Sequence, residues 1–459
     1  MPAWKSSVPG IAWPALPAPQ GAALLALQYQ FAQSERLAPA ALQAQQFRQL
    51  RAVVTHAMKT VPWHRERLAA AGLAPDRDID PQALRRIPLM TRRDVQAAGN
   101  ALLSTAIPPD HGRPVEYRTG GSTGEPVSML GTELNRLFWL AFTLRDHLWH
   151  RRDFAGTLCA IRSRVDDRVQ PGWGTATDNV AATGPCAILN ITADTGRQLE
   201  WLQQHAGAYL LTHPVNVRAL AHYSLQHGIR LPQLKEVRTF GETVTDDLRA
   251  LCREAWNVPL TDSYSAEETG YLALQCPEQG RYHVQAENVI VELLDDAGQP
   301  CAPGTTGRVV VTPLHNFAMP LFRYVLGDYA EAGEACPCGR GLPVLARILG
   351  RSRHMFVLPG GRRYFPSSPI IRSAGVAPIQ QIQLVQHTLE RVEARFVAER
   401  ALQPDEERGM TAAIQDALGH PFTITLSPVT DIPRSTSMKF DAFVCRIPVD
   451  EDTHARAPS

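Results

Sequence analysis

The sequence carries almost no net charge and no apolar run long enough to cross a membrane. Its 46 lysines and arginines are offset by 45 aspartates and glutamates, so the formal net charge is only +1. A nearly neutral chain provides no field for holding nucleic acid or an anionic membrane surface. Five prolines between Pro2 and Pro19 interrupt the first residues, which excludes the apolar core of a signal peptide there. We therefore expect a cytoplasmic protein with neither nucleic acid nor membrane as a partner.

Cysteine is also sparse, with eight residues scattered through a chain of 459. This distribution fits reduced thiols or metal ligands better than a disulfide framework. A chain of this length is too long for a single core, and its 44% hydrophobic content is ample for several. We expect two or three structural units.

The pattern of apolar residues predicts a mixed α/β fold. Residues 22–104 are predicted to be mostly helical. Between 158 and 214, short apolar runs alternate with polar segments, for example a strand at 187–192 and a helix at 195–205. This alternation is typical of a largely parallel sheet flanked by helices. Residues 287–312 are predicted to form β-hairpins, and a helix at 404–418 lies between strands in an α+β arrangement.

A helix is also predicted at 133–150, where Leu137, Phe138, Ala141 and Phe142 recur at helical spacing. Aromatic side chains of such a helix can form the wall of a substrate pocket. An aromatic stripe at this spacing is more often part of the core. We favour the core interpretation.

The stretch Tyr117 to Pro126, Tyr-Arg-Thr-Gly-Gly-Ser-Thr-Gly-Glu-Pro, is rich in glycine and hydroxyl side chains. Glycines let the backbone turn tightly and leave amide and hydroxyl groups free to surround an anion. No Gly-Lys-Ser/Thr follows, so this is not a Walker A loop, and the dinucleotide-binding spacing is absent. Taken alone, an ordinary surface turn is the better explanation.

Several short motifs follow this loop in a fixed order: Gly241-Glu242, Tyr264 to Gly270, Arg323 to Asp328, Gly350-Arg351 and Lys439. The series resembles the adenylate-forming (acyl-CoA synthetase) superfamily, and most of all its phenylacetate-CoA ligase branch, from about residue 53 to residue 440. The resemblance implies a large N-terminal domain and a small mobile C-terminal domain. The expected boundaries are 1–104 for an N-terminal helical part, 105–350 for the AMP-binding core with a β subdomain at about 284–347, and 351–459 for an α+β domain.

The resemblance also implies roles for individual residues. Glu268 would hold Mg²⁺, because a hard cation prefers carboxylate and phosphate oxygens. Lys439 would bridge the substrate carboxylate and the α-phosphate, and Asp328 would accept hydrogen bonds from the ribose. Lys439, Glu268 and Thr123 are the expected catalytic residues. The expected nucleotide-binding residues are Thr119, Gly120, Gly121, Ser122, Thr123, Gly124, Gly241, Glu242, Ser263, Tyr264, Asp328 and Arg351.

The implied reaction is the ATP-dependent activation of a carboxylic acid, aromatic or arylacetic in this branch, as an acyl adenylate, followed by transfer to coenzyme A. A carrier protein or an amine in a natural-product pathway is an alternative acceptor. A binding protein that kept the fold and lost catalysis is a second alternative, favoured by the family-atypical Val127, Ser265 and Met438. The acid and the oligomeric state, a homodimer included, stay open.

Four metal-ligand side chains form two pairs in the sequence. Cys276 and His283 are separated by six residues, and Cys336-Pro-Cys338-Gly brings two thiols into one tight turn. Three thiolates and one imidazole are a tetrahedral Zn²⁺ set, and some relatives in this branch carry a similar set. Four unrelated reduced side chains are the alternative. A closed four-ligand site would be structural and would not join the chemistry.

Overall fold

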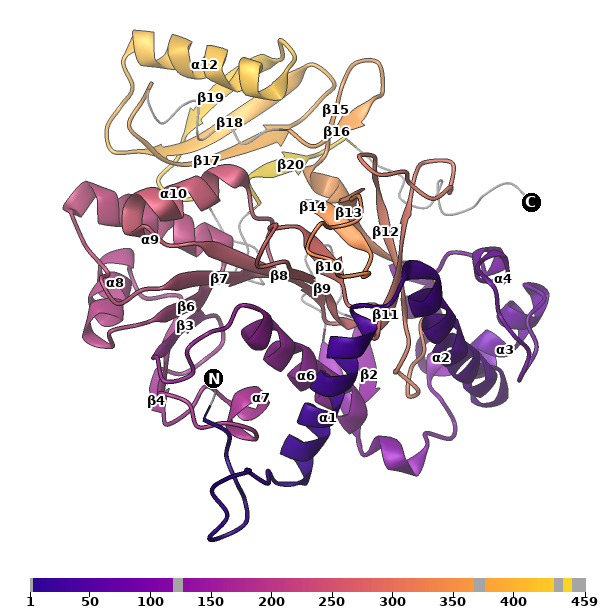
Figure 1. Cartoon of the computed structure of the whole chain (residues 1–459). Coiled ribbons are helices and arrows are strands. Elements are labelled where there is room, and N and C mark those ends of the chain that lie inside the picture. The colour runs from indigo at the N-terminus through magenta and orange to yellow at the C-terminus, as the bar shows by residue number, and fades with distance from the viewer. Residues whose placement is uncertain (1–2, 119–126, 367–375, 433–440, 448–459) are drawn as a thin grey trace.

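The computed structural model describes residues 3–118, 127–366, 376–432 and 441–447 (Figure 1). The N-terminal domain is built on a twelve-stranded mixed sheet with the order β11-β12-β13-β14-β10-β9-β8-β7-β6-β3-β5-β4, and the C-terminal domain on a four-stranded sheet. The mixed α/β prediction is therefore confirmed. None of the helices within these ranges is long and apolar enough to span a membrane.

The parallel part of the large sheet comprises β3 (Leu158–Arg162), β5 (Cys186–Asn190), β6 (Tyr209–Thr212), β7 (Glu236–Phe240) and β8 (Leu260–Ala266). The helices α8 (Thr195–Gln204), α9 (Pro214–His227) and α10 (Asp246–Trp256) connect successive strands and bury their apolar faces against them. After β5 the chain crosses to the other side of β3 to form β6. Such a reversal of strand order leaves a crevice at the carboxyl ends of the strands.

Other helices cover the opposite face of the parallel strands. These are α1 (Pro19–Ser34), α6 (Glu133–Trp149) and α7 (Thr175–Asp178), and the short strand β4 (Arg168–Gln170) closes that edge of the sheet antiparallel to β5. Phe31 of α1 stacks on Phe142 of α6 with ring centroids 4.7 Å apart. Ala141 and Phe142 belong to this core, as predicted from their spacing.

Antiparallel strands continue the same sheet. They are β9 (Gly270–Gln275), β10 (Tyr282–Val284), β14 (Val344–Arg351), β13 (Tyr324–Ala332), β12 (Thr306–Pro313) and β11 (Val289–Leu294). The strands expected as a β subdomain thus extend the main sheet. A core cluster joins α2 (Pro39–Thr60), α3 (Pro62–Ala70) and α4 (Pro81–Arg86) to Ile290, Leu314 and Phe322.

Short elements complete the large domain. The helix α5 (Arg92–Ala98) begins with a capping box between Thr91 and Asp94, and the hairpin β1 (Pro114–Arg118) and β2 (Ser128–Thr132) precedes α6. Single 3-10 turns lie at Gly99–Leu102, Pro109–His111 and Ser352–His354.

The C-terminal domain packs α12 (Pro404–Leu418) on the sheet of β17 (Ile379–Gln386), β18 (Arg391–Ala398), β19 (Thr423–Pro428) and β20 (Phe443–Cys445). A two-stranded ribbon of β15 (Phe356–Val357) and β16 (Arg363–Tyr364) joins it to the large domain. The helix has the bounds predicted from the sequence. Met410, Ile414 and Leu418 recur along it at helical spacing and face the core of this domain.

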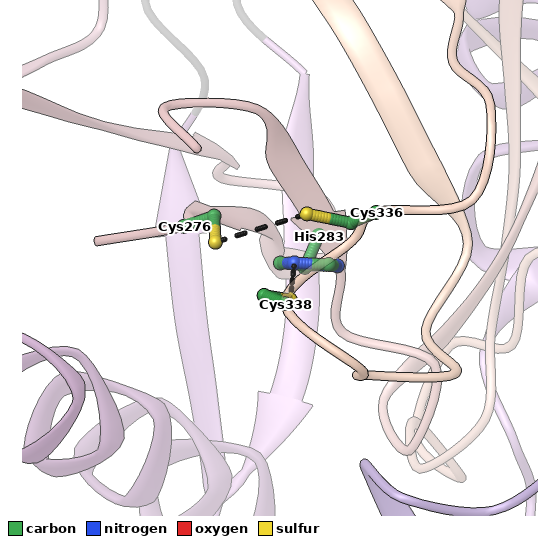
Figure 2. Close-up of side chains that lie close together, drawn as sticks. All are labelled: Cys276, His283, Cys336 and Cys338. Carbon is green, nitrogen blue, oxygen red and sulfur yellow. Dashed lines mark hydrogen bonds between the residues drawn. The ribbon is translucent and has the colours of Figure 1, made fainter. Parts of the chain in front are cut away.

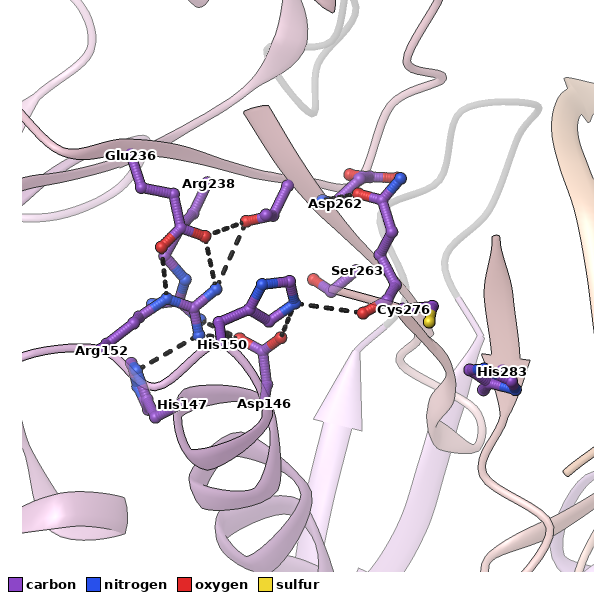
Figure 3. A network of polar contacts seen from close by, with 12 residues as sticks. Asp146, His147, His150, Arg152, Glu236, Arg238, Asp262, Ser263, Cys276 and His283 are labelled. Carbon is purple, nitrogen blue, oxygen red and sulfur yellow. Dashed lines mark hydrogen bonds and ion pairs between the residues drawn. The ribbon is translucent and has the colours of Figure 1, made fainter. Parts of the chain in front are cut away.

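A buried network of charges holds α6 to the parallel strands (Figure 3). Arg152 makes a two-pronged contact with Glu236 of β7 at 2.8 and 2.7 Å, and it also pairs with Asp146 of α6 at 2.7 Å. Arg238 of β7 contacts the same Asp146 oxygen at 2.7 Å. Burial opposes ionisation of Asp146, but the two arginines outweigh it and hold the pKa of this carboxyl well below its usual range. The C-terminal end of α6 is therefore fixed to the strands whose ends carry the candidate site.

Candidate functional site

A cavity of about 1270 Å³ lies at the carboxyl ends of the parallel strands. Residues that follow β3, β6, β7 and β8 form one wall, and residues of β13 and β14 form another. Asp441 to Phe443 of the C-terminal domain also line it. The cavity thus lies where the strand order reverses and where the two domains meet.

Three residues predicted to bind the nucleotide come together on the wall of this cavity. The Tyr264 hydroxyl donates to one carboxylate oxygen of Asp328 at 2.8 Å, and Arg351 Nε pairs with the other oxygen at 2.8 Å. Asp328 and Arg351 are register partners on β13 and β14, so the sheet sets this pairing. Gly327 has φ +84°, and a Cβ there would lie 3.1 Å from Arg351 Nη1. A side chain at position 327 would therefore crowd the Arg351 guanidinium, and glycine avoids this contact.

Glu268 lies in the turn between β8 and β9 and lines the same cavity. Burial raises the pKa of its carboxyl, Arg351 lowers it, and the neighbouring Asp328 raises it further. Its charge is thus incompletely compensated by the protein, which is the electrostatic setting that a divalent cation relieves. The adjacent Glu267 is exposed. The two adjacent glutamates therefore have different surroundings.

Gly241, Glu242 and Ser263 also lie on the cavity wall. Gly241 follows β7 with φ +76°, a conformation that favours glycine. The Glu242 carboxylate accepts a hydrogen bond from the backbone N–H of Val215, at 3.0 Å, in the first turn of α9. Glu242 therefore ties the loop after β7 to the start of a helix in addition to facing the cavity.

Several predicted residues lie outside the described residues. These are the phosphate-loop residues Thr119, Gly120, Gly121, Ser122, Thr123 and Gly124, and the lysine Lys439. Described residues near both segments line the cavity: Tyr117 and Met129 from the hairpin that flanks the loop, and Asp441 shortly after the lysine.

Part of the cavity wall is aromatic, whereas the spacing of the aromatic residues of α6 favours a role in the core. Trp139 of α6 packs against Tyr271 of β9 with ring centroids 4.5 Å apart, and Trp139 remains 40% exposed. A Cβ on Gly270 would lie 3.7 Å from the Trp139 ring. Gly270 is two residues after Glu268, so the Trp139 ring lies beside the segment that carries Glu268. Trp139 lies outside the apolar stripe of α6. A tryptophan outside such a stripe is the signal in the sequence that could have pointed to it.

The four predicted metal ligands also come together (Figure 2), and none of them lines the cavity. The ligand atoms of Cys276, His283, Cys336 and Cys338 all lie within 4.8 Å of one another. The sulfurs of Cys276 and Cys336 are 3.9 Å apart, and Cys338 Sγ is 3.3 Å from His283 Nε2. With Zn–S bonds of about 2.3 Å, a tetrahedral site has ligand separations of roughly 3.5 to 3.8 Å. The donor set and its spacing therefore fit a zinc ion.

Arg340 connects this cysteine cluster to the N-terminal helices. Its Nη1 lies 4.0 Å from Cys276 Sγ and 3.0 Å from a Glu278 oxygen, and its Nε lies 3.4 Å from Glu35 at the end of α1. The backbone N–H of Gly341 donates to the Glu35 carbonyl at 2.8 Å. The turn that carries the two C-terminal thiols is thus joined to the junction of α1 and α2.

No protein-family model matches the chain. A phenylacetate-coenzyme A ligase of Thermus thermophilus is 26% identical over 436 residues, which are 87% of this chain and 95% of that protein. One of Pseudomonas putida is 24% identical over 336 residues, 70% of this chain and 73% of that protein.

Among solved structures, a 2-hydroxyisobutyryl-CoA ligase in the postadenylation state, in complex with 2-HIB-AMP, matches with a TM-score of 0.73 at 17% identity and covers 92% of both chains. The same ligase in the thioesterification state matches with a TM-score of 0.57 at 18% identity, over 88% of this chain and 90% of that chain. The sequence relatives and the fold agree with the motif order. The chain is thus similar over most of its length to phenylacetate-coenzyme A ligases and has the fold of a solved CoA ligase, which supports the resemblance to the adenylate-forming superfamily and its phenylacetate-coenzyme A ligase-like branch.

Proposed function

We propose that the protein is an AMP-forming acid–thiol ligase that converts a carboxylic acid and ATP to an acyl adenylate and pyrophosphate, and then passes the acyl group to coenzyme A. The observation that carries the proposal is the convergence of Tyr264, Asp328, Arg351 and Glu268 on one cavity wall. The relatives named as phenylacetate-coenzyme A ligases, and a CoA ligase neighbour in complex with an acyl-AMP, support it.

The chemistry of these side chains suits a nucleotide. A carboxylate held by Tyr264 and Arg351 is oriented before a ligand arrives, so Asp328 can accept hydrogen bonds from two adjacent hydroxyls without reorganising. Glu268 would hold Mg²⁺, which offsets negative charge on phosphate oxygens when it is bound. The reaction needs positioning and charge neutralisation, and it needs no protein nucleophile. Lys439 and the loop from Thr119 to Gly124 are proposed to supply the remaining contacts to the phosphates.

The same cavity favours an aromatic acid. Trp139 and Tyr271 form an aromatic wall of the cavity with their ring planes tilted by 32°, and Tyr271 lies three residues after Glu268 in the chain. Aromatic groups pack well against such rings at offset or tilted angles. The acid would lie against this wall with its carboxylate directed toward the nucleotide site.

The arrangement of the domains is compatible with the adenylation half of the reaction. The chain matches the neighbouring ligase better in its postadenylation state than in its thioesterification state, with TM-scores of 0.73 and 0.57. We propose that the C-terminal domain turns about the segment near Arg353 between the two half-reactions. In the present arrangement His354 Nε2 contacts Asp441 at 2.9 Å. Asp441 lies two residues after Lys439 in the chain.

We further propose that the cysteine cluster holds a structural Zn²⁺ through three thiolates and His283. The proposal rests on the distances between the four ligand atoms and on the link through Arg340 to Glu35. A closed site of this kind stabilises the folded chain and leaves no coordination position for substrate.

The experiment that tests the ligase proposal is acid-dependent release of pyrophosphate across a panel of aromatic and aliphatic acids. Mass analysis with and without coenzyme A then identifies the thioester. Release with no thioester, together with a hydroxamate when hydroxylamine is added, would point to a carrier protein or an amine as acceptor. No release with any acid would favour a binding protein without catalysis.

A further inference from the structure

His315 is a polar side chain on the cavity wall with no hydrogen-bond partner among the described residues. It follows β12 and stacks flat on Phe138 of α6, with ring centroids 3.8 Å apart and an angle of 13° between the planes. Its Nδ1 is sealed from solvent and unpartnered. Because Nδ1 is sealed, any hydrogen bond that this cavity-lining ring makes to a ligand is made through its other nitrogen, Nε2.

Most of the neighbouring polar side chains of the cavity are already engaged. The Asn316 amide donates to Leu130 O at 3.0 Å, and its oxygen accepts from Ala318 N and Met319 N. The Asn288 amide donates to the carbonyls of Thr269 and Tyr271 at 3.2 and 3.0 Å.

Two further groups near the aromatic wall are also used. The Tyr271 hydroxyl accepts a hydrogen bond from Thr143 Oγ1 at 3.2 Å, and Asn135 Oδ1 accepts from the backbone N–H of Thr132 at the start of α6. The asparagines and the tyrosine hydroxyl therefore serve the fold. His315 is a polar group of this wall that the fold leaves for a ligand.

We infer that His315 binds a neutral hydrogen-bonding substituent, a hydroxyl or an amino group, on the aromatic part of the acid substrate. The inference rests on the proposed function, and it names the substrate class of that same cavity. The acid would pack against Trp139 and Tyr271, and the polar substituent would reach His315 on the wall beside them.

The charge state of His315 selects the kind of substituent. Burial, with a smaller contribution from His111, lowers the pKa of His315 to about 3. A neutral imidazole has one donor and one acceptor nitrogen, which suits a hydroxyl or an amine. A second carboxylate on the acid would have its charge compensated only by the imidazolium form, which burial disfavours, and an unsubstituted ring would offer the histidine no hydrogen bond.

The test compares phenylacetate with its ortho-, meta- and para-hydroxy and amino derivatives in the pyrophosphate-release assay. We expect the best substituted acid to exceed phenylacetate in kcat/KM by about tenfold to a hundredfold. His315→Phe keeps the stacking on Phe138 and should reduce this ratio by about tenfold or more, mainly through the substituted acid. His315→Gln should retain part of the preference, because its amide can still donate and accept.

His111→Phe is the matched control. His111 also has a buried, unpartnered Nδ1 and packs on Phe317 at 4.6 Å, but it does not line the cavity. This variant should leave the ratio of the two acids unchanged. A wild-type preference for phenylacetate, or a ratio that stays within about twofold in His315→Phe, would overturn the inference.

Binding of the same acids can be measured through the quenching of tryptophan fluorescence. This measurement separates the inference from the proposed function. If no acid releases pyrophosphate, the ligase proposal fails, and the ratio of dissociation constants for substituted and unsubstituted acids still decides the role of His315. If His315→Phe does not fold, the comparison of wild type with His315→Gln decides it by the same two measurements.

Discussion

The buried charges beneath the site allow one prediction to be worked out in detail. Replacing Arg152 by methionine removes a cation that touches two buried carboxylates, Asp146 at 2.7 Å and Glu236 at 2.8 and 2.7 Å. The two carboxylates are then left in different situations. Asp146 keeps direct contacts with Arg238 at 2.7 Å and His150 at 3.6 Å, whereas Glu236 keeps a hydrogen bond from Thr261 and a weaker electrostatic interaction with Arg238.

Glu236 therefore dominates the cost of this substitution. Leaving one partner of a buried ion pair uncompensated destabilises a protein by about 3–5 kcal/mol. For a domain as large as this one, each kcal/mol lowers Tm by roughly 1–2 °C. We expect the melting transition of Arg152→Met to fall by roughly 3–10 °C, since methionine fills most of the arginine volume and leaves little cavity.

The pH dependence gives this prediction a sign. Burial raises the pKa of Glu236, but Arg152 outweighs it, so the folded-state pKa of this carboxyl is lowered. A lowered pKa contributes stability above the unfolded value of about 4.3 that is lost as pH falls. Without Arg152, only the smaller effects of Arg238 and of the Thr261 hydrogen bond oppose burial, so the pKa of this carboxyl rises and it can protonate in the folded state. The stability deficit of Arg152→Met relative to wild type should therefore shrink as the pH falls from 8 to 5.

Differential scanning calorimetry of four proteins checks this reasoning. Arg152→Met/Glu236→Gln should recover a large part of the lost stability, because it removes the stranded charge. Arg151→Met, next in the chain but exposed, is the control and should change Tm by less than about 2 °C. The reasoning is refuted if Arg152→Met melts within about 2 °C of wild type, or if its deficit grows as pH falls.

Three further predictions concern the chemistry. Glu268→Gln should lower pyrophosphate release by about a hundredfold or more with unchanged melting, whereas Glu267→Gln should cost far less; equal losses would contradict the assignment of the acid. Lys439→Ala should cripple adenylate formation and largely spare thiolysis of supplied acyl-AMP, and equal loss in both half-reactions would argue against domain alternation. Elemental analysis should find about one zinc per wild-type chain and much less in Cys336→Ser and Cys338→Ser, and zinc unaffected by both substitutions would defeat the metal proposal.

The sequence predicts those parts of the molecule that depend on neighbours in the chain. The helix at Pro404–Leu418 has the predicted bounds, because a proline in its first turn and a glycine just after its end mark them locally. The pairing of Asp328 with Arg351 depends on strand register across the sheet. The prediction that these two residues share one site came from the order of the motifs in the sequence and not from their spacing.

Long-range packing explains what sequence reasoning could not reach. The strands expected as a separate β subdomain join the main sheet, because β9 pairs with β8 on one side and β10 on the other, a choice that no local pattern encodes. Trp139 and His315 become cavity residues only through the way α6 and the segment after β12 pack. Their neighbours in the chain, Phe138 and Asn316, serve the fold instead.

The cysteine cluster is connected through one strand to the cavity wall that carries Tyr264 and Asp328. His283 is a cluster residue on β10, and the hydroxyl of the preceding Tyr282 donates to Asp262 of β8 at 2.8 Å. Burial raises the pKa of Asp262 to about 6, and Thr239 Oγ1 is a second donor to it at 2.8 Å. The residues after Asp262 are Ser263 and Tyr264. A metal that fixes β10 would therefore hold the position of the tyrosine that orients Asp328, although no cluster residue lines the cavity. A structural ion can in this way support binding at a site that it does not touch.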